Sequence, residues 1–475
     1  MKKTYDFVAV ENFLWTPHIQ TSLEILIRNK AKRKAFIYLN IDNPDNPDIP
    51  NNRFKIFGKK RIEKKLKKIL KKKRIDYIKI SKENIISHSA LNKKFKISKF
   101  SDLSKLKMKG CNIGFGIASS LVDRLKKRDP SLIDCKKNIL DLYIKTTIQV
   151  FLTMEKIFRI YNLKKILTFN GRFAHSAVIK NFCYKKKIDI FFHERSDNKN
   201  RYYLNSRPVH DMQAWRKMAT NSWKTSKLSL KKKQNIGKKW FEDRQKNKFA
   251  DGLNHTKFQV RGKIPNFPQN KRIITFFSHS DEEYAYCQEL KHPIFSNQRE
   301  TIIWLIKYFK NKKNTIFVLR IHPNLLNKSK TDIKWWHSLK KKYNHKNFLL
   351  VGSKSECDSY ALIKKSDITL TFCSSSIALE STYLGAPSIV IGDSQYRSTQ
   401  SAHHPKSIKE LKNLITKKKI KPKPKNNALK FAFFRATYGN KYKFYKPKNN
   451  FEGKIFNEKF NYYPEFLLQI KKLLT

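Results

Sequence analysis

Three consecutive serines stand out as potential donors to a phosphate group: Ser374, Ser375 and Ser376. The apolar run 367–372 before them predicts a buried strand, and the residues after them predict a helix. The amide groups and dipole at the start of a helix favour an anion, and serine hydroxyls add further donors. Glu380 on the same helix has a carboxylate that can accept from ribose hydroxyls. The alternative is ordinary helix capping, with Glu380 on a solvent-exposed face.

A second set of polar residues follows two other predicted strands in the same half of the chain. Ser278 and Ser280 lie at the end of one strand. Arg320 and His322 lie at the end of the next. Because ligands bind at the carboxyl edge of an open parallel sheet, we expect these side chains beside the three serines, where they would bind phosphate. The alternatives are a structural His-Pro loop and helix capping.

The N-terminal half offers two candidates for a general base, the group that takes a proton from an attacking hydroxyl. His18 follows the predicted strand 5–12, and Glu194 comes near the end of the predicted strand 188–196. We prefer Glu194 as the catalytic residue and keep His18 beside it. The alternatives are a histidine in a surface loop and a surface charge pair between Glu194 and Arg195.

A polar turn follows the predicted strand 164–169 in the same half. It consists of Asn170, Gly171 and Arg172. Glycine permits a tight turn, and the guanidinium is suited to an anionic acceptor or to the donor phosphate. The alternative for Arg172 is a surface position at the start of a helix. No Asp-x-Asp pair has a plausible metal context, so we expect no metal site.

The composition limits the possible partners. The chain has 475 residues and 103 Lys and Arg against 37 Asp and Glu, a net charge of +66. The lysines run from end to end, which favours genome composition as their origin over a dedicated polyanion or anionic-membrane surface. No motif supports specific nucleic-acid binding. The basic helix predicted at 59–74 fits either an α/β crossover or an anionic lipid surface.

Alternation of strands and helices predicts an α/β fold with two tandem Rossmann-like domains facing a cleft and a C-terminal helical segment. The six cysteines form no Cys-x-x-Cys pair, and no apolar run is long enough to span a membrane. We therefore expect a cytoplasmic protein, with peripheral attachment to the inner face of the cell membrane left open. The expected domains are an acceptor domain at 1–205, a linker or helical insertion at 206–268, a donor domain at 269–416, and a linker with helices packing back on the body at 417–475.

Three segments resemble the GT-B glycosyltransferases of bacterial capsular and surface polysaccharide synthesis: "VLRIHPN", "SDITLTFCSSSIALESTYLGAPSIVIGDSQY" and "ILTFNGRFAHSAVIKNFCYKKKIDIFFHERS". The His-Pro and serine-cluster motifs are similar to those of polysialyltransferases, capsule Kdo transferases and CDP-glycerol polymerases. The resemblance implies that His322 and the serines contact the donor phosphate, that Glu380 lies near the ribose, and that His18 occupies a loop that holds the base in several GT-B enzymes. The acidic-acidic-Gly motif of polysialyltransferases has no counterpart in the N-terminal half.

The expected function is therefore inverting, metal-independent transfer of a sugar or polyol phosphate. The donor would be linked to CMP, CDP, UDP or GDP, and the acceptor would be a glycan or a lipid-linked glycan. Two alternatives remain open at this stage. One is a nucleotide-sugar epimerase on the same scaffold, and the other is a non-catalytic protein that binds polyanions or supports assembly.

Overall fold

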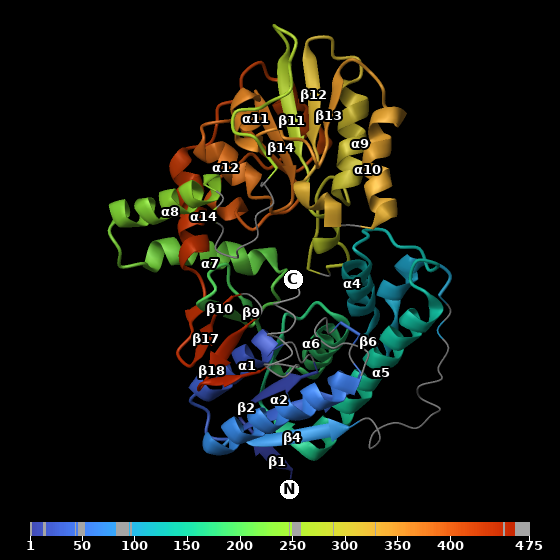
Figure 1. Cartoon of the computed structure of the whole chain (residues 1–475), viewed down its shortest axis with the longest axis vertical. Helices are drawn as coiled ribbons and strands as arrows, with labels where there is room; N and C mark the ends of the chain where they lie inside the picture. The colour runs from blue at the N-terminus through green and yellow to red at the C-terminus, as the bar shows by residue number, and fades with distance from the viewer. Residues whose placement is uncertain are drawn as a thin grey trace. The chain divides into compact units, whose positions relative to one another are not determined.

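The computed structural model describes residues 2–12, 16–42, 44–45, 53–81, 95, 97–246, 248, 258–287, 289–327, 329–449 and 452–460. The chain forms two compact units, each with its own parallel sheet, which confirms the predicted α/β class (Figure 1). Unit 1 comprises Met1–Arg124, Asp129–Val209 and Gly439–Thr475, and unit 2 comprises Leu125–Arg128 and His210–Tyr438.

The main sheet of unit 1 has the strand order β16-β10-β9-β8-β2-β3-β4. Its strands are β2 (Phe7–Glu11), β3 (Lys34–Asn40), β4 (Asp76–Ser81), β8 (Lys165–Phe169), β9 (Asp189–Arg195), β10 (Arg201–Asn205) and β16 (Asn440–Lys441). The five strands from β9 to β4 run parallel, whereas β10 and β16 add antiparallel pairs at one side. The carboxyl ends of β2, β8 and β9 therefore meet at one edge of the sheet.

Two helices share a hydrophobic core with the β2 and β3 strands of unit 1. These are α1 (Thr16–Arg28) and α2 (Arg53–Lys72). The apolar side of α2 consists of Ile62, Leu66, Ile69 and Leu70, each at most 5% exposed. The basic helix predicted at 59–74 is therefore the crossover between β3 and β4. Its apolar face, which the alternative hypothesis placed on an anionic lipid surface, is buried. The other helices of unit 1 are α4 (Gly114–Leu125), α5 (Lys137–Ile160) and α6 (Ala174–Lys186).

The sheet of unit 2 has the order β13-β12-β11-β14-β15, and every neighbouring pair is parallel. Its strands are β11 (Arg272–Phe277), β12 (Thr315–Arg320), β13 (Phe348–Val351), β14 (Ile368–Phe372) and β15 (Ser388–Ile391). In this register Phe277 lies between Arg320 and Thr371. The loops that follow β11, β12 and β14 therefore begin at the same edge.

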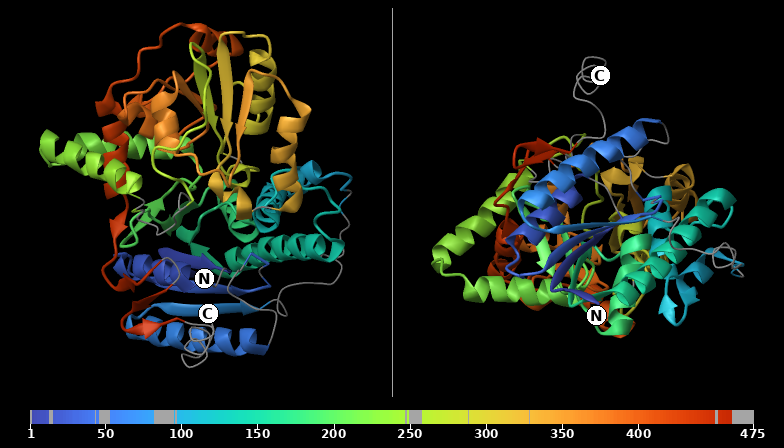
Figure 2. Two further views of the ribbon diagram at one scale, coloured as in Figure 1. Left: turned by 45° about the horizontal axis from the view of Figure 1, so that its top comes forward. Right: turned by 90° about the horizontal axis from the view of Figure 1, so that it is seen from below.

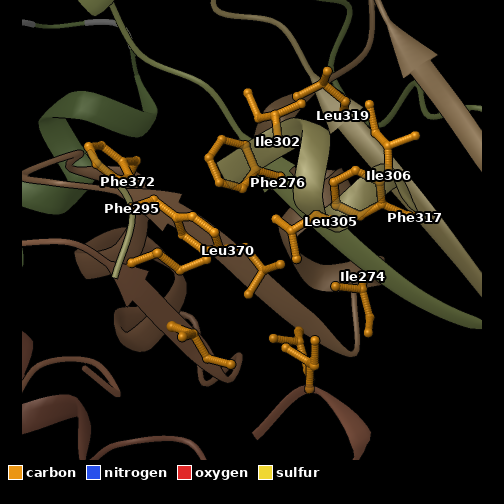
Figure 3. Close-up of a cluster of buried hydrophobic side chains, with 14 of the residues drawn as sticks. Ile274, Phe276, Phe295, Ile302, Leu305, Ile306, Phe317, Leu319, Leu370 and Phe372 are labelled. Carbon is orange, nitrogen blue, oxygen red and sulfur yellow. The ribbon is translucent and has the colours of Figure 1, made fainter. Parts of the chain in front are cut away.

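Helices cover both faces of this sheet because its buried residues alternate along each strand. Ile274 and Phe276 pack with the helices on one face (Figure 3), whereas Ile273 and Phe277 pack toward the other. The first face is covered by α9 (Gln298–Phe309), α10 (Lys330–Lys342) and α13 (Ile408–Thr416). The second is covered by α11 (Ser359–Lys365), with α12 (Ile377–Tyr383) following β14 on the side of α11 (Figure 1).

The unit boundaries differ from those predicted from the sequence. The predicted insertion 206–268 contributes α7 (Met212–Thr225) and α8 (Leu230–Gln245), which pack on α14 (Lys425–Thr437) within unit 2. After α14 the chain forms short strands where helices were predicted: β16, β17 (Tyr445–Pro447), β18 (Gly453–Ile455) and β19 (Glu458–Lys459). The predicted helices within 461–475 lie outside the described residues.

One buried carboxylate explains why this last segment belongs to unit 1. Glu24 on α1 accepts hydrogen bonds from the backbone N–H groups of residues 443, 444 and 445, at 2.7, 2.8 and 2.9 Å. Its side chain is fully buried. Charge-assisted bonds of this kind are strong, and they fix β17 and β18 (red) beside α1 (blue), as Figure 2 shows.

Among the described residues, no helix combines the length and the apolar character needed to cross a bilayer.

Candidate functional site

The edge of unit 2 brings the His-Pro loop against the loop that follows β11. The backbone N–H of His322 donates to Ser278 Oγ at 2.8 Å, and Asn324 Nδ2 donates to Ser280 Oγ at 3.2 Å. The N–H of Asn324 donates to His322 Nδ1 at 3.1 Å. Because Nδ1 accepts, the neutral imidazole carries its proton on Nε2, which makes Nε2 the donor of the ring. Ser278 thus holds the backbone of His322, and Ser280 holds the neighbouring Asn324.

The three serines lie at the same edge, two strands from His322. Cys373 before them has a φ of 55°, which turns the chain sharply out of β14. Ser374 Oγ accepts from the N–H of Gln395 at 3.0 Å, and the carbonyl of Ser375 accepts from the Tyr396 hydroxyl at 2.8 Å. Within the described residues the Ser375 hydroxyl makes no hydrogen bond, and its side chain is half-buried. Ser375 is therefore the serine best placed to donate to a ligand.

Glu380 and Ser376 share a partner that the sequence did not indicate. Arg244 on α8 donates through Nε to Glu380 at 2.9 Å and through Nη2 to Ser376 Oγ at 2.8 Å. Glu380 is 3% exposed, so the alternative that placed it on a solvent-exposed face is wrong. A ribose hydroxyl would have to share this carboxylate with the guanidinium. Ser376 precedes α12 without a side-chain cap, so ordinary capping does not explain it either.

Arg320 does not fit the phosphate site predicted for it. Its side chain is buried at 2% exposure and donates to the carbonyls of Gly352, Ser355 and Cys357 in the loop after β13. Burial lowers the pKa of the guanidinium. The strand ends where we predicted, but the Arg320 side chain points under the neighbouring loop and not toward the serines' side of the edge. We therefore remove Arg320 from the candidate site.

One further feature of this edge comes from the structure alone. The His279 ring stacks on Phe372, with ring centroids 6.1 Å apart, and its Nε2 atom is buried without a partner in the described part of the chain. A separate pocket of about 480 Å³ lies between the end of α8 and α11, and the residues that line it include Lys246, Arg261 and Asp358 but none of the candidate site residues.

The corresponding edge of unit 1 holds a buried network of titratable side chains. Ser22 Oγ donates to Glu11 Oε1 at 2.6 Å and lies 2.7 Å from His193 Nε2. The same histidine nitrogen lies 3.0 Å from Glu11 Oε1. Glu11, Ser22 and His193 are all fully buried. Since Ser22 donates to Glu11, His193 must donate through Nε2, so this network orients side chains and exposes none of the three to a substrate.

The two base candidates lie next to each other beside this network. His18 Nδ1 is 3.9 Å from Glu194 Oε1, and the His18 ring lies against Phe169 with centroids 3.7 Å apart. His18 is fully buried, so the alternative that placed it in a surface loop is wrong. Burial, then the neighbouring His193 and Arg195, holds the pKa of His18 well below its ordinary value, so its ring is neutral.

Glu194 is the more accessible of the two candidates, since 21% of its side chain is exposed. Its Oε2 accepts from Asn170 Nδ2 at 2.8 Å, and its Oε1 accepts from the backbone N–H of Arg195 at 2.9 Å. These two bonds fix the carboxylate at the end of β9. The alternative was a surface charge pair between Glu194 and Arg195. Instead, the Asn170 amide and the backbone N–H of Arg195 hold the carboxylate.

The polar turn after β8 presents Asn170 to Glu194. Asn170 and Gly171 have φ angles of 55° and 83°, and a Cβ on Gly171 would come within 2.7 Å of the Phe192 ring. Only glycine fits there, as predicted for a tight turn. Arg172 donates through Nε to Ser119 Oγ on α4 at 2.6 Å.

The described residues include no group of three or more His, Cys, Asp or Glu side chains arranged to hold a metal ion. The expectation of a metal-independent site stays a prediction. Glu11, Ser22, His193 and Arg244 were missed from the sequence. For Glu11 and His193 a signal existed, because both lie at predicted strand ends, whereas nothing in the sequence linked Arg244 to Glu380.

The chain matches no model of a known protein family and no curated protein. Among solved structures it is similar to "Thermosulfurimonas dismutans KpsC, beta Kdo 2,4 transferase", with 10% identity, 59% of this chain and 85% of that chain covered, and a TM-score of 0.35. It is also similar to a UDP-GlcNAc 2-epimerase from Neisseria meningitidis bound to UDP-GlcNAc (11% identity, 91% and 99% covered, TM-score 0.25) and to Acinetobacter baumannii MurG (8%, 92% and 96%, 0.25). At these TM-scores the likenesses carry no argument, and the α/β class stands on the two sheets described above.

Proposed function

We propose that the chain is a GT-B glycosyltransferase that moves a sugar or polyol phosphate from a nucleotide-activated donor to a surface-polysaccharide acceptor. The observation that carries the proposal is the common edge of unit 2, where His322 and Ser375 lie at the ends of parallel strands. Imidazole N–H and hydroxyl donors at such an edge suit a phosphate.

The proposed roles divide between the units. In unit 2, His322 Nε2–H and the Ser375 hydroxyl donate to the donor phosphate, and Glu380, held by Arg244, contacts the ribose. In unit 1, Glu194 takes the proton of the acceptor hydroxyl, whose oxygen then bonds to the anomeric carbon of a sugar donor or to the distal phosphorus of a polyol-phosphate donor. The nucleotide leaves with the electron pair of the broken carbon–oxygen or phosphorus–oxygen bond, and its developing charge falls on donors already in place. His18, buried and neutral, positions Glu194.

A thermal-shift screen with CMP, CDP, UDP and GDP and their sugar conjugates tests the donor site. A ligand that binds the native state raises the melting temperature, and at a hundredfold excess over Kd it adds about 2.7 kcal/mol. We expect one nucleotide to stabilise the protein, which would also argue against a non-catalytic polyanion-binding protein. Turnover of the conjugate without an acceptor would favour the epimerase alternative, and no stabilisation by any nucleotide would contradict the proposal.

A further inference from the structure

The two helices α7 and α8 form a basic hairpin without acidic side chains between Met212 and Phe241. Residues 212–241 contain nine Lys and Arg and no Asp or Glu, which is about twice the net charge density of the whole chain, +66 over 475 residues. Charge alone does not distinguish the hairpin, since residues 156–188 also hold nine Lys and Arg without Asp or Glu. What distinguishes it is that it projects from the rest of unit 2 (Figures 1 and 2, green) and exposes apolar side chains at its tip.

The tip of the hairpin also exposes apolar side chains. Leu228, in the turn between the two helices, is 40% exposed, and Leu230, the first residue of α8, is 56% exposed. Lys227, Lys231 and Lys232 flank them and are exposed as well. Exposed leucines flanked by lysines are typical of a membrane-surface element. In such an element the apolar residues enter the acyl boundary and the cations contact lipid phosphates.

Both helices of the hairpin pack against α14. Gly237 of α8 approaches α14 so closely that a Cβ would come within 2.7 Å of the Leu429 carbonyl oxygen. The ring of Trp223 packs edge-on against Phe433, with centroids 5.5 Å apart. The inner side of the hairpin is therefore used in packing, whereas the leucines at its tip take no part in the core.

We propose that the α7–α8 tip docks on an anionic lipid bilayer. Charge complementarity selects an anionic surface, and the exposed leucines favour a bilayer over a nucleic acid, whose backbone would gain nothing from them. From the sequence, the apolar face of α2 was an alternative candidate for lipid binding, but that face is buried. The hairpin is therefore a different attachment element. This inference does not depend on transferase activity, because lipid binding needs no nucleotide.

The test is co-sedimentation of the full chain with phosphatidylcholine vesicles, with and without phosphatidylglycerol. We expect binding only when phosphatidylglycerol is present, with weakening at high salt. The variant Lys227→Glu/Lys231→Glu/Lys232→Glu should partition roughly a hundred-fold more weakly, since each cation near an anionic surface contributes roughly a five-fold gain. Leu228→Ser/Leu230→Ser should weaken binding about ten-fold at unchanged charge.

A matched control separates this site from the general charge of the chain. Lys334, Lys340 and Lys341 are exposed on α10 of the same unit, so their triple change to Glu removes the same charge. We expect it to bind vesicles like the unmodified chain. Equal loss in the control and the hairpin variant would overturn the proposal, as would no phosphatidylglycerol dependence. Unchanged vesicle binding by the leucine variant, together with tight binding of single-stranded RNA, would assign the hairpin to nucleic acid instead.

Discussion

The two sheet edges differ in what they place at the ends of their strands. The edge of unit 1 collects titratable groups, and Glu11, His18 and His193 are fully buried there. The edge of unit 2 also holds the buried Glu380, but it presents half-buried donors as well, His322 and Ser375. Buried networks orient a reactive group, whereas accessible neutral donors bind an anion without a large desolvation cost. Under the proposed function, proton transfer belongs to unit 1 and anion binding to unit 2.

The largest effect should come from Glu194→Gln. Removal of a general base slows turnover by about 10²–10⁴-fold, while nucleotide binding to unit 2 should be unchanged. Steady-state kinetics and titration calorimetry measure the two quantities separately. Glu356→Gln is a suitable control, since this exposed glutamate lies in unit 2 away from the serines. A wild-type rate in Glu194→Gln would contradict the assignment of the general base to Glu194.

The contrast in burial predicts unequal effects on stability. Glu11→Ala leaves the Ser22 hydroxyl and His193 Nε2–H without their acceptor, which should cost about 3 kcal/mol of unfolding free energy. Ser375→Ala, at the edge of unit 2, should stay within about 0.5 kcal/mol of the wild type. Urea unfolding followed by circular dichroism measures both. Equal losses would show that the two edges are not built differently.

Because of its buried histidines, the chain should lose stability as the pH is lowered. Burial lowers the pKa of His175, at the start of α6, to about 3. Below pH 6.5 the unfolded state binds a proton that the folded state rejects, so stability is present at neutral pH and lost progressively toward pH 3. From pH 7 to 5 this histidine should cost about 2 kcal/mol.

Urea unfolding at the two pH values measures that slope. His175→Leu should remove one histidine's share of it, and the exposed His337 on α10 serves as the control through His337→Gln. A slope unchanged by His175→Leu would show that this histidine is protonated in the folded state.

The sequence predicted the edges better than the contacts across them. Alternating strands and helices were enough to place His322 at the same sheet edge as the serines, because parallel strands end at one edge, and Gly171 was identified from its turn. The direction of Arg320 could not be predicted, since it depends on how the loop at 352–357 packs. The bond between Arg244 and Glu380 joins residues 136 positions apart, and Glu24 binds backbone groups more than 400 positions away. Such pairs are fixed by tertiary packing, for which a single sequence gives no signal.

The most direct test of the central claim is calorimetric titration of His322→Ala with the nucleotide that stabilises the wild type. If the edge of unit 2 holds the donor phosphate, the loss of this imidazole should weaken binding about ten-fold or more, since a hydrogen bond to a charged group is worth about 1.5–3 kcal/mol. Lys340→Ala on α10 should leave the affinity unchanged. Equal affinity in the wild type and His322→Ala would contradict the account.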